Sequence, residues 1–450
     1  MTTIPSQLSM DFIQAEEIQE TKKPELSNGR ANKLDLQDRA FHDWYRFVLS
    51  FPPHLVQDYI RKFGLQKNNV ILDPFCGTGT TLVEAKLSGM QAIGMEGNPF
   101  PYFASSVKTD WNLSGDELSK QARMVSEKVL SIFKAQEIDD NLSFGNSGNL
   151  ALRTLSPEVE KLILANSISP LPLHKVLVLF ECLKKFEGEP FYRHALLALG
   201  NALVFKISNL HFGPEAGVKN QKADIPVISN WLVEIEKMAN DLRQVSGKSY
   251  FDAKVHLADA RSLDIIETNS VDAVITSPPY PNEKDYTRTT RLESVLLGFI
   301  NNKEELRELK KRLIRSNTRG IYKGDDDDKW VDTFPEIQRI AEEIEKRRIE
   351  LGKDSGFEKL YARAAKLYFG GMAKHLSDLR RILHPGAQLA YVVGDQASYL
   401  RVLIRTGQIL GDIAKSLGYE LVNIDLFRTR LATATKEQLR EEVVVLKWKG

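Results

Sequence analysis

Five consecutive residues, Thr276-Ser-Pro-Pro-Tyr280, follow an apolar run and have the types needed for group transfer to an amine. Two prolines fix the backbone and lack N–H donors, so the carbonyl groups of Ser277 and Pro278 remain free to accept hydrogen bonds. An exocyclic amine needs such acceptors, because its lone pair is delocalised into the ring and hydrogen bonds from its two N–H groups favour a pyramidal nitrogen. Tyr280 offers a ring on which an extruded base can stack. Ser277, Pro278, Pro279 and Tyr280 are therefore candidate catalytic residues, with a proline-rich exit loop as the alternative.

A second motif, Asp73-Pro-Phe-Cys-Gly-Thr-Gly-Thr80, is a glycine-rich turn after an apolar strand. Gly77 and Gly79 leave room for a ligand to lie against the backbone. The motif is no phosphate-binding P-loop, because GxxxxGK[ST] is absent, and it lacks the third glycine of the dinucleotide fingerprint. A tight turn in an α/β fold is the alternative interpretation.

Acidic residues end the next two predicted strands. Glu96 follows the glycine turn by one helix and one strand, and a carboxylate there can accept both hydroxyls of a ribose. Asp259 stands at the matching end of the third strand and could take an adenine amino group, while Asp264 and Asp252 are alternatives for that role.

Together the two motifs resemble those of the S-adenosylmethionine-dependent amino-group DNA methyltransferases, and specifically the N4-cytosine branch. The resemblance implies methyl transfer from S-adenosylmethionine to the N4 amino group of a cytosine flipped out of double-stranded DNA at a specific sequence, leaving S-adenosylhomocysteine. It also implies that the cofactor-binding residues are Asp73, Phe75, Gly77, Gly79, Glu96, Asp259 and Pro53. Pro53 is included in this set because Phe51–Tyr59 is similar to the helix that contacts the methionine end of the cofactor in that family.

Three alternatives remain open: an N6-adenine DNA methyltransferase, an RNA base methyltransferase, and a non-catalytic nucleic-acid-binding protein on the same fold. Cytosine C5 methylation is set aside, because it needs a cysteine nucleophile, usually after a proline. Cys76 and Cys182 do not follow prolines. The cofactor motif precedes the catalytic loop, the reverse of many N4-cytosine enzymes. The DNA-recognition region is therefore hard to place by analogy, and the two insertions are the candidates for it.

Net charge is +1 over 450 residues, but its distribution is uneven. Residues 281–323 hold 11 Lys and Arg against 6 Asp and Glu, a local net charge of +5. Such a segment can bind phosphates or can be a solvated helix. The candidate DNA-binding residues are Arg288, Lys310, Lys311, Arg315 and Arg319, with Lys310 and Lys311 on a helix and Arg315 and Arg319 in a loop that could enter a groove.

Two cysteines make no disulfide framework, and no Cys/His spacing suggests a metal site. No apolar run approaches the roughly 20 residues of a membrane span. We expect a cytoplasmic, nucleoid-associated protein without metal or membrane contact. Its partner is double-stranded DNA, and a cognate restriction endonuclease is a further candidate, while the oligomeric state is left open.

The elements that must position these residues alternate between strand and helix. The pattern predicts an α/β fold with a doubly wound, seven-stranded, Rossmann-like methyltransferase sheet and a reversed edge strand, plus helical insertions. We expect a polar N-terminal segment (1–40), a catalytic domain (41–100 and 250–450), an inserted helical subdomain (101–249), and a charged insertion that is a candidate DNA-recognition region (291–351). The expected strands are 70–75, 91–96, 254–259, 273–279, 388–394, 419–427 and 441–448.

Overall fold

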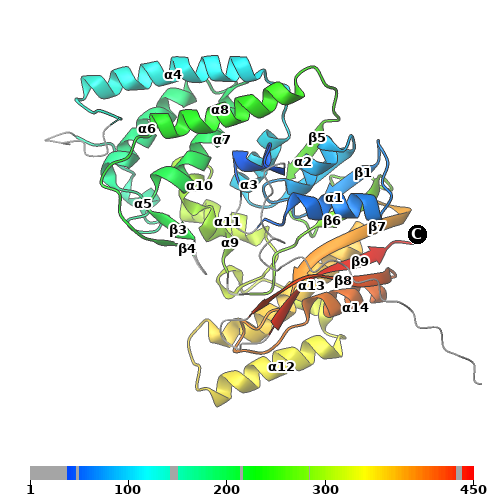
Figure 1. Cartoon of the computed structure of the whole chain (residues 1–450). Coiled ribbons are helices and arrows are strands. Elements are labelled where there is room, and N and C mark those ends of the chain that lie inside the picture. The colour runs from blue at the N-terminus through cyan, green and yellow to red at the C-terminus, as the bar shows by residue number, and fades with distance from the viewer. Residues whose placement is uncertain (1–37, 47–49, 142–150, 213–215, 283, 432–437) are drawn as a thin grey trace, which may run out of the picture.

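A single large sheet organises the catalytic part of the chain. The computed structural model describes residues 38–46, 50–141, 151–212, 216–282, 284–431 and 438–450. Seven strands lie in the order β5-β2-β1-β6-β7-β9-β8 (Figure 1). Their bounds are β1 Val70–Asp73, β2 Gln91–Glu96, β5 Ala253–Leu257, β6 Val271–Thr276, β7 Leu383–Gly394, β8 Glu420–Leu431 and β9 Gln438–Lys447. The predicted seven-stranded α/β sheet is confirmed.

The position of the reversed strand differs from the prediction. Strands β5, β2, β1, β6 and β7 are mutually parallel, whereas β9 is antiparallel to both β7 and β8. Because the chain turns back after β8 and inserts β9 beside β7, the reversed strand lies one place inside the sheet. The edge strand β8 runs parallel to β7, so the prediction of a reversed edge strand was wrong in this detail.

Helices bury the sheet on both faces. Ile71 packs with α1 (Pro53–Lys62) and α2 (Thr80–Leu87), while the next residue, Leu72, packs with helices on the other face. Those helices are α12 (Pro335–Glu350), α13 (Tyr361–Leu379) and α14 (Thr406–Ser416), visible below the sheet in Figure 1. Successive strand residues point to opposite faces, and a parallel sheet covered on both sides needs apolar residues at each position. This explains the unbroken apolar run at β1.

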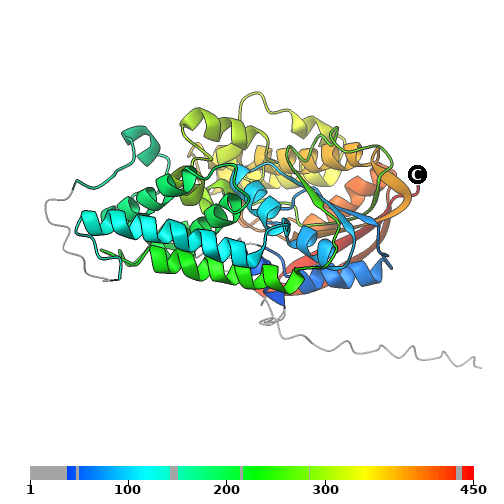
Figure 2. The same ribbon diagram turned by 90° about the horizontal axis from the view of Figure 1, so that it is seen from above.

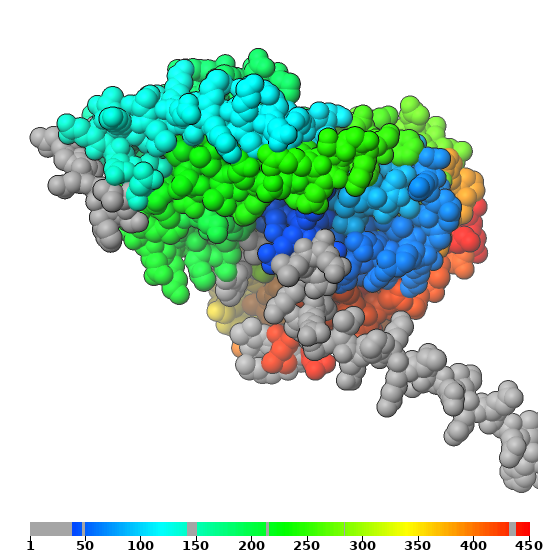
Figure 3. Space-filling view, turned by 45° about the horizontal axis from the view of Figure 1, so that its top comes forward, coloured from blue at the N-terminus to red at the C-terminus, as the bar shows by residue number. Residues whose placement is uncertain are grey.

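A helical insertion separates β2 from β5. It follows α3 (Pro99–Lys108) and contains α4 (Gly115–Ala135), α5 (Pro157–Glu160), α6 (Pro170–Lys184), α7 (Tyr192–Ala202) and α8 (Ile228–Val245). Ser114 caps α4 by accepting a hydrogen bond from the Glu117 N–H at 3.4 Å, as the capping box predicts. Figure 2 shows the insertion beside the sheet, and Figure 3 shows α4 and α8 lying along each other on its surface.

The sequence from Asn209 to Glu215, Asn-Leu-His-Phe-Gly-Pro-Glu, predicts a loop, but the segment contains a strand. β3 (Leu210–Phe212) pairs with β4 (Ala216–Val218) in an antiparallel two-stranded sheet. Leu210 faces Val218 in this pair. Residues 213–215 lie outside the described chain.

The second insertion lies between β6 and α13 and is mostly helical. It begins with α9 (Tyr286–Thr289), α10 (Arg291–Leu296) and α11 (Lys303–Lys311). Two short 3-10 helices, η4 (Thr318–Gly320) and η5 (Asp327–Val331), precede α12. Another, η6 (Glu358–Leu360), leads into α13. In the described part of the chain, no helix combines the length and apolarity that a membrane span requires, and no group of side chains has the makings of a metal site.

Candidate active site

A cavity of about 660 Å³ opens where β1, β2, β6 and β7 end. Both motifs contribute to its wall: the turn after β1 supplies Phe75 and Gly77, and the loop after β6 supplies Ser277 through Tyr280. Ligand sites of open α/β sheets lie at this edge, because the strands' carboxyl ends meet there. The fold therefore brings together two motifs that stand about 200 residues apart in the sequence.

The two glycines of the turn have different surroundings. Gly77 has a φ of +51° and lines the cavity, and a Cβ placed on it would meet no atom within 4 Å. Gly79, with a φ of +84°, precedes α2 and would bring a Cβ to 3.0 Å from the Ser105 Cβ. Gly77 thus leaves open space for a ligand, whereas Gly79 permits close packing of α2 on α3 and does not line the cavity.

Glu96 is held at the end of β2 by the backbone. One carboxylate oxygen accepts from the Gly77 N–H at 3.0 Å and the other from the Asn98 N–H at 2.8 Å. Burial raises the pKa of Glu96 to about 7, against the effect of these two hydrogen bonds. The side chain lines the cavity beside the glycine turn, where the sequence predicts a ribose contact.

Asp73 lies behind the cavity wall and not on it. Its carboxylate is fully buried, and one oxygen accepts from the Thr276 hydroxyl at 2.6 Å and from the Phe75 N–H at 3.1 Å. Burial raises the pKa of Asp73 to about 6. The predicted cofactor contact is corrected to a supporting contact: Asp73 joins the end of β1 to the end of β6, and so joins the two motifs.

The catalytic loop is fixed by its neighbours on β7 and α9. The Ser277 hydroxyl donates to the Val392 carbonyl at 3.2 Å, so it is occupied within the protein. The Tyr280 N–H donates to the Tyr286 hydroxyl oxygen at 3.3 Å, and burial raises the pKa of the Tyr280 phenol. A Cβ placed on Gly394 would come within 2.9 Å of the Tyr280 ring, so only glycine lets the ring lie against the end of β7.

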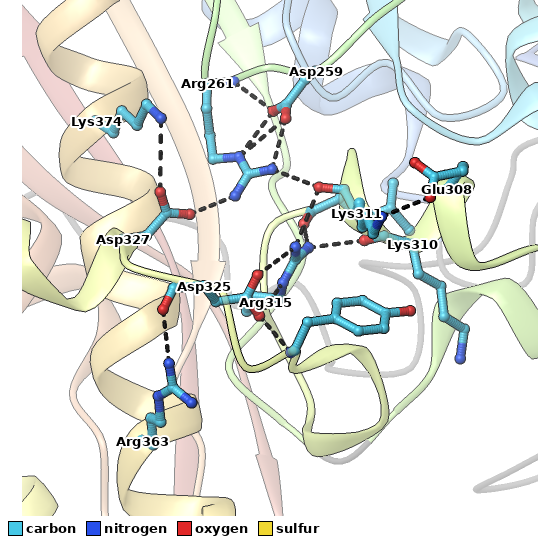
Figure 4. Close-up of polar contacts among 12 residues, drawn as sticks. Asp259, Arg261, Glu308, Lys310, Lys311, Arg315, Asp325, Asp327, Arg363 and Lys374 are labelled. Atoms are coloured by element: carbon cyan, nitrogen blue, oxygen red, sulfur yellow. Dashed lines mark hydrogen bonds and ion pairs between the residues drawn. The ribbon is translucent and has the colours of Figure 1, made fainter.

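The predicted adenine-side acid, Asp259, does not line the cavity. Arg261 donates to both of its carboxylate oxygens, through Nε at 3.0 and 3.2 Å and Nη2 at 2.6 Å (Figure 4). The backbone around it still contributes, because Ala258 and Ala260 line the cavity. The prediction is corrected because a side chain two residues along the chain engages the carboxylate.

Pro53 and Arg288 are also placed away from the cavity wall. Pro53 is buried at the start of α1, while Ser50 and Phe51 just before it line the cavity. Arg288 lies in α9 and is half-buried. The start of the helix that precedes β1 therefore lies near the cavity, as the resemblance implies. The residues that line the cavity are Ser50 and Phe51, just before the helix, and not Pro53.

The four other predicted DNA-binding residues divide into buried and exposed side chains. Arg315 is buried and donates to both oxygens of Asp325 at 2.8 Å, which corrects its assignment to a groove-entering loop (Figure 4). Lys310 lines the cavity and pairs with Asp285 at 2.7 Å. Lys311 and Arg319 are exposed: Lys311 pairs with Glu308 on the same helix, and Arg319 lies over the ring of Phe357.

The sequence interpretation missed two groups of wall residues. Arg428, Arg430 and Glu441, from β8 and β9, line the cavity, and Arg428 Nε donates to Glu441 at 2.5 Å. The second group is the segment 312–317 that follows α11, of which the sequence interpretation named only Arg315, and that for DNA binding. Arg428 and Arg430 are two residues apart on one strand, so both side chains lie on the same face of the sheet. That this face is turned to the cavity depends on the insertion of β9 between β7 and β8.

Comparisons with known proteins give the context for this site. The family model N6_N4_Mtase, a DNA methylase model, matches residues 15–102, which include the glycine turn and Glu96. The Type II methyltransferase M.BsoBI of Geobacillus stearothermophilus is 26% identical, over 95% of this chain and 87% of that protein. The Type II methyltransferase M.AvaI of Nostoc sp. is 22% identical, over 96% of this chain and 89% of that protein.

Among solved structures, TrmN from Thermus thermophilus aligns with 91% of this chain and 52% of its own, at 12% identity and a TM-score of 0.29. The matches to the family model and to the two Type II methyltransferases confirm the predicted resemblance to the amino-group DNA methyltransferases and, with it, the predicted enzyme class of a site-specific DNA methyltransferase.

Proposed function

We propose that this chain transfers a methyl group from S-adenosylmethionine to the exocyclic N4 amino group of a cytosine flipped out of double-stranded DNA. The observation that carries the proposal is the single cavity that Gly77, Glu96, Pro278 and Tyr280 line together. A donor and an acceptor can therefore meet in one enclosed space, which methyl transfer requires. We also propose that the protein acts in the cytoplasm at the nucleoid, and that an endonuclease of the same sequence specificity is its partner.

The donor end of the cavity fits an adenosine-bearing ligand. The open space at Gly77 lets a ligand approach the backbone, and the Glu96 carboxylate is held beside it to accept hydrogen bonds from ribose hydroxyls. Bound S-adenosylmethionine supplies an electrophilic methyl group on its sulfonium.

The acceptor end fits an amino-bearing base. The Ser277 hydroxyl donates to Val392, so Ser277 contributes its carbonyl group, together with that of Pro278, as acceptors for the two N–H groups of the base. Tyr280 supplies the stacking surface. The guanidinium groups of Arg428 and Arg430 line the same cavity, and their N–H donors complement the O2 and N3 acceptors of cytosine.

Mass spectrometry of nucleosides tests the product. Duplex DNA incubated with the purified protein and S-adenosylmethionine should yield N4-methylcytosine. N6-Methyladenine would overturn the assignment of the base, and 5-methylcytosine would overturn the chemistry. Methylation of RNA in preference to DNA would overturn the substrate.

A pair of substitutions at Tyr280 tests the acceptor end. Tyr280→Ala should lose stacking worth about 1–3 kcal/mol, and so lower kcat/KM for DNA, while the affinity for S-adenosylmethionine is retained. Tyr280→Phe keeps the ring and should keep most of the activity. Ser277→Ala should have a smaller effect than Tyr280→Ala, because the backbone carbonyl is unchanged. Full activity of Tyr280→Ala on duplex DNA would place the base elsewhere.

A further inference from the structure

A short segment of the second insertion, Arg312–Asn317, crosses the cavity, and we refer to it as the strap. All six of its residues line the cavity, and it joins α11 to the 3-10 helix η4. The residues from Ile314 to Asn317 are buried, although the surrounding sequence is rich in charge. The strap is therefore a packed part of the site and not a solvated linker.

Leu313 occupies the region next to Glu96. A Cβ placed on Gly97 would lie 2.8 Å from Leu313 Cδ2 and 3.5 Å from the Arg312 carbonyl oxygen. The Ala258 carbonyl oxygen approaches the same point at 3.7 Å. If the Glu96 carboxylate holds a ribose, Leu313 and Ala258 lie just beyond it, at the ends of β2 and β5, where the attached adenine ring would be.

Two arginines hold the backbone at and just before Leu313. Arg261 donates to the Lys311 carbonyl at 2.7 Å while also pairing with Asp259 and Asp327 (Figure 4). Arg315 donates to the carbonyl oxygens of Lys310 at 2.8 Å and Lys311 at 3.3 Å, and to that of Leu313. The Lys311 carbonyl thus accepts from both guanidinium groups, which fixes the chain two residues before Leu313.

The far end of the strap is tied to the catalytic loop. The Ser316 carbonyl accepts from the Asn282 N–H at 3.0 Å and from the Tyr399 hydroxyl at 2.8 Å. Asn282 stands two residues after Tyr280. One short segment therefore runs from the donor end of the cavity to the acceptor end.

We propose that the strap is the roof of the cofactor site, with Leu313 packed on the adenine of S-adenosylmethionine and Arg261 acting as a positioning residue for it. This inference rests on the proposed function. In it, Asp259 anchors Arg261 and makes no contact with adenine. The charged insertion then contributes to cofactor binding in addition to any contact with DNA.

Calorimetric titration of S-adenosylmethionine into the full chain tests the roof. Leu313→Ala removes apolar contact and should raise the Kd about tenfold. Leu351→Ala is the matched control, because Leu351 belongs to the same insertion but is 55% exposed and does not line the cavity. Its Kd should stay within twofold of the wild-type value.

Arg261→Lys tests positioning while it keeps the positive charge. Lysine cannot reach two carboxylates and the Lys311 carbonyl together, so the Kd should rise about threefold to tenfold and the KM for DNA should stay unchanged. In the Leu313→Ala, Arg261→Lys double variant the two effects should not multiply, because Arg261 acts through the placement of Leu313. A general loss of structure would instead weaken the binding of both S-adenosylmethionine and DNA.

The outcomes separate the roof from the proposed function. Gly77→Leu fills the donor end and should abolish binding of S-adenosylmethionine. If Gly77→Leu abolishes binding while Leu313→Ala and Arg261→Lys leave the Kd unchanged, the roof is overturned and the proposed function stands. If the wild-type chain binds no S-adenosylmethionine, both are overturned. Multiplying effects in the double variant would overturn the positioning role of Arg261.

Discussion

Glu96 is a buried carboxylic acid whose proposed role, accepting hydrogen bonds from a ribose, requires the ionised form. Burial raises its pKa to about 7 from an ordinary value of 4.5, although two backbone N–H groups favour the ionised form. The raised value means that ionising Glu96 costs the unliganded protein stability as the pH rises from about 4.5 through about 7. Ribose hydroxyls that donate to the carboxylate would offset part of this cost.

The affinity for S-adenosylmethionine should therefore depend on pH. Only ionised Glu96 accepts from both ribose hydroxyls, so the Kd should fall as the pH rises through about 7 and level off above it. Titration calorimetry between pH 5.5 and 8.5 would measure this directly. Glu96→Gln, which is neutral at each pH, should bind more weakly and show a flatter profile. A wild-type Kd that is constant across the range would argue against a ribose contact at Glu96.

Residues that lie on the cavity could be predicted from the sequence where the neighbouring residues alone fix their place in the fold. Glu96 ends a strand, and Gly77 and Ser277–Tyr280 stand in the turns just after two others. Strand ends meet at one edge of the sheet, so the structure places all of these residues on the cavity. Asp259 and Arg315 were misjudged because their partners decide their roles. Asp259 faces Arg261, which a distant Asp327 also holds, and the charge pattern alone cannot show that Arg315 is buried against Asp325.

Among the elements, the contact between η5 and α13 is unusually close. A Cβ placed on Gly370 of α13 would lie 1.8 Å from the Asp327 carbonyl oxygen in η5. Asp327 in turn pairs with Arg261, which holds the strap. A glycine in the middle of a helix lowers the stability of the helix by up to about 1 kcal/mol. At Gly370 this cost accompanies the close contact between α13 and the second insertion.

Gly370→Ala should separate these two elements. The methyl group would collide with backbone that cannot move aside cheaply, so the free energy of unfolding should fall by about 1–3 kcal/mol. Gly371→Ala is the control: the nearest atom to its Cβ would be 3.5 Å away, an ordinary contact, and it should be neutral or slightly stabilising. Chemical denaturation of both variants measures the difference. Equal stabilities would show that η5 can shift freely on α13.

Arg315 and Arg319 make a matched pair within the second insertion. Removing Arg315 leaves the half-buried Asp325 without its ion-pair partner, and among the described residues only the Tyr322 N–H still donates to it. Arg315→Ala should therefore lower the free energy of unfolding by about 1.5–3 kcal/mol. Arg319→Ala removes an exposed side chain and should change it by less than about 0.5 kcal/mol. If the exposed side of the insertion contacts DNA, Arg319→Ala should also flatten the salt dependence of DNA binding. A stable Arg315→Ala variant with altered site preference would restore the original assignment to DNA reading.

Element boundaries followed from periodicity and turn residues, because these are local signals. β2 spans the predicted residues 91–96. The internal position of β9 could not be predicted, because a hairpin can place its return strand on either side of its partner. That choice also decides which side chains of β8 face the cavity, so Arg428 and Arg430 were missed for the same reason.

At the scale of the molecule, the two insertions stand in different relations to the cavity. Most of the helical insertion packs in its own core with α3, while the second insertion packs on α13 and provides the strap. The exposed basic side chains Lys311 and Arg319 lie on the second insertion. The second insertion therefore has the residues to contact both the methyl donor and the DNA.

The hydrogen bond between Asp73 and Thr276 has a consequence for synthesis of the protein. These residues are neighbours in the sheet but 203 positions apart in the chain. At a ribosomal rate of about 5–20 residues per second, β1 remains without β6 for on the order of ten to forty seconds. The whole helical insertion emerges in that interval. Its long helices can fold around their own core while the unpaired side of β1 waits, so the site is completed only after most of the chain has left the ribosome.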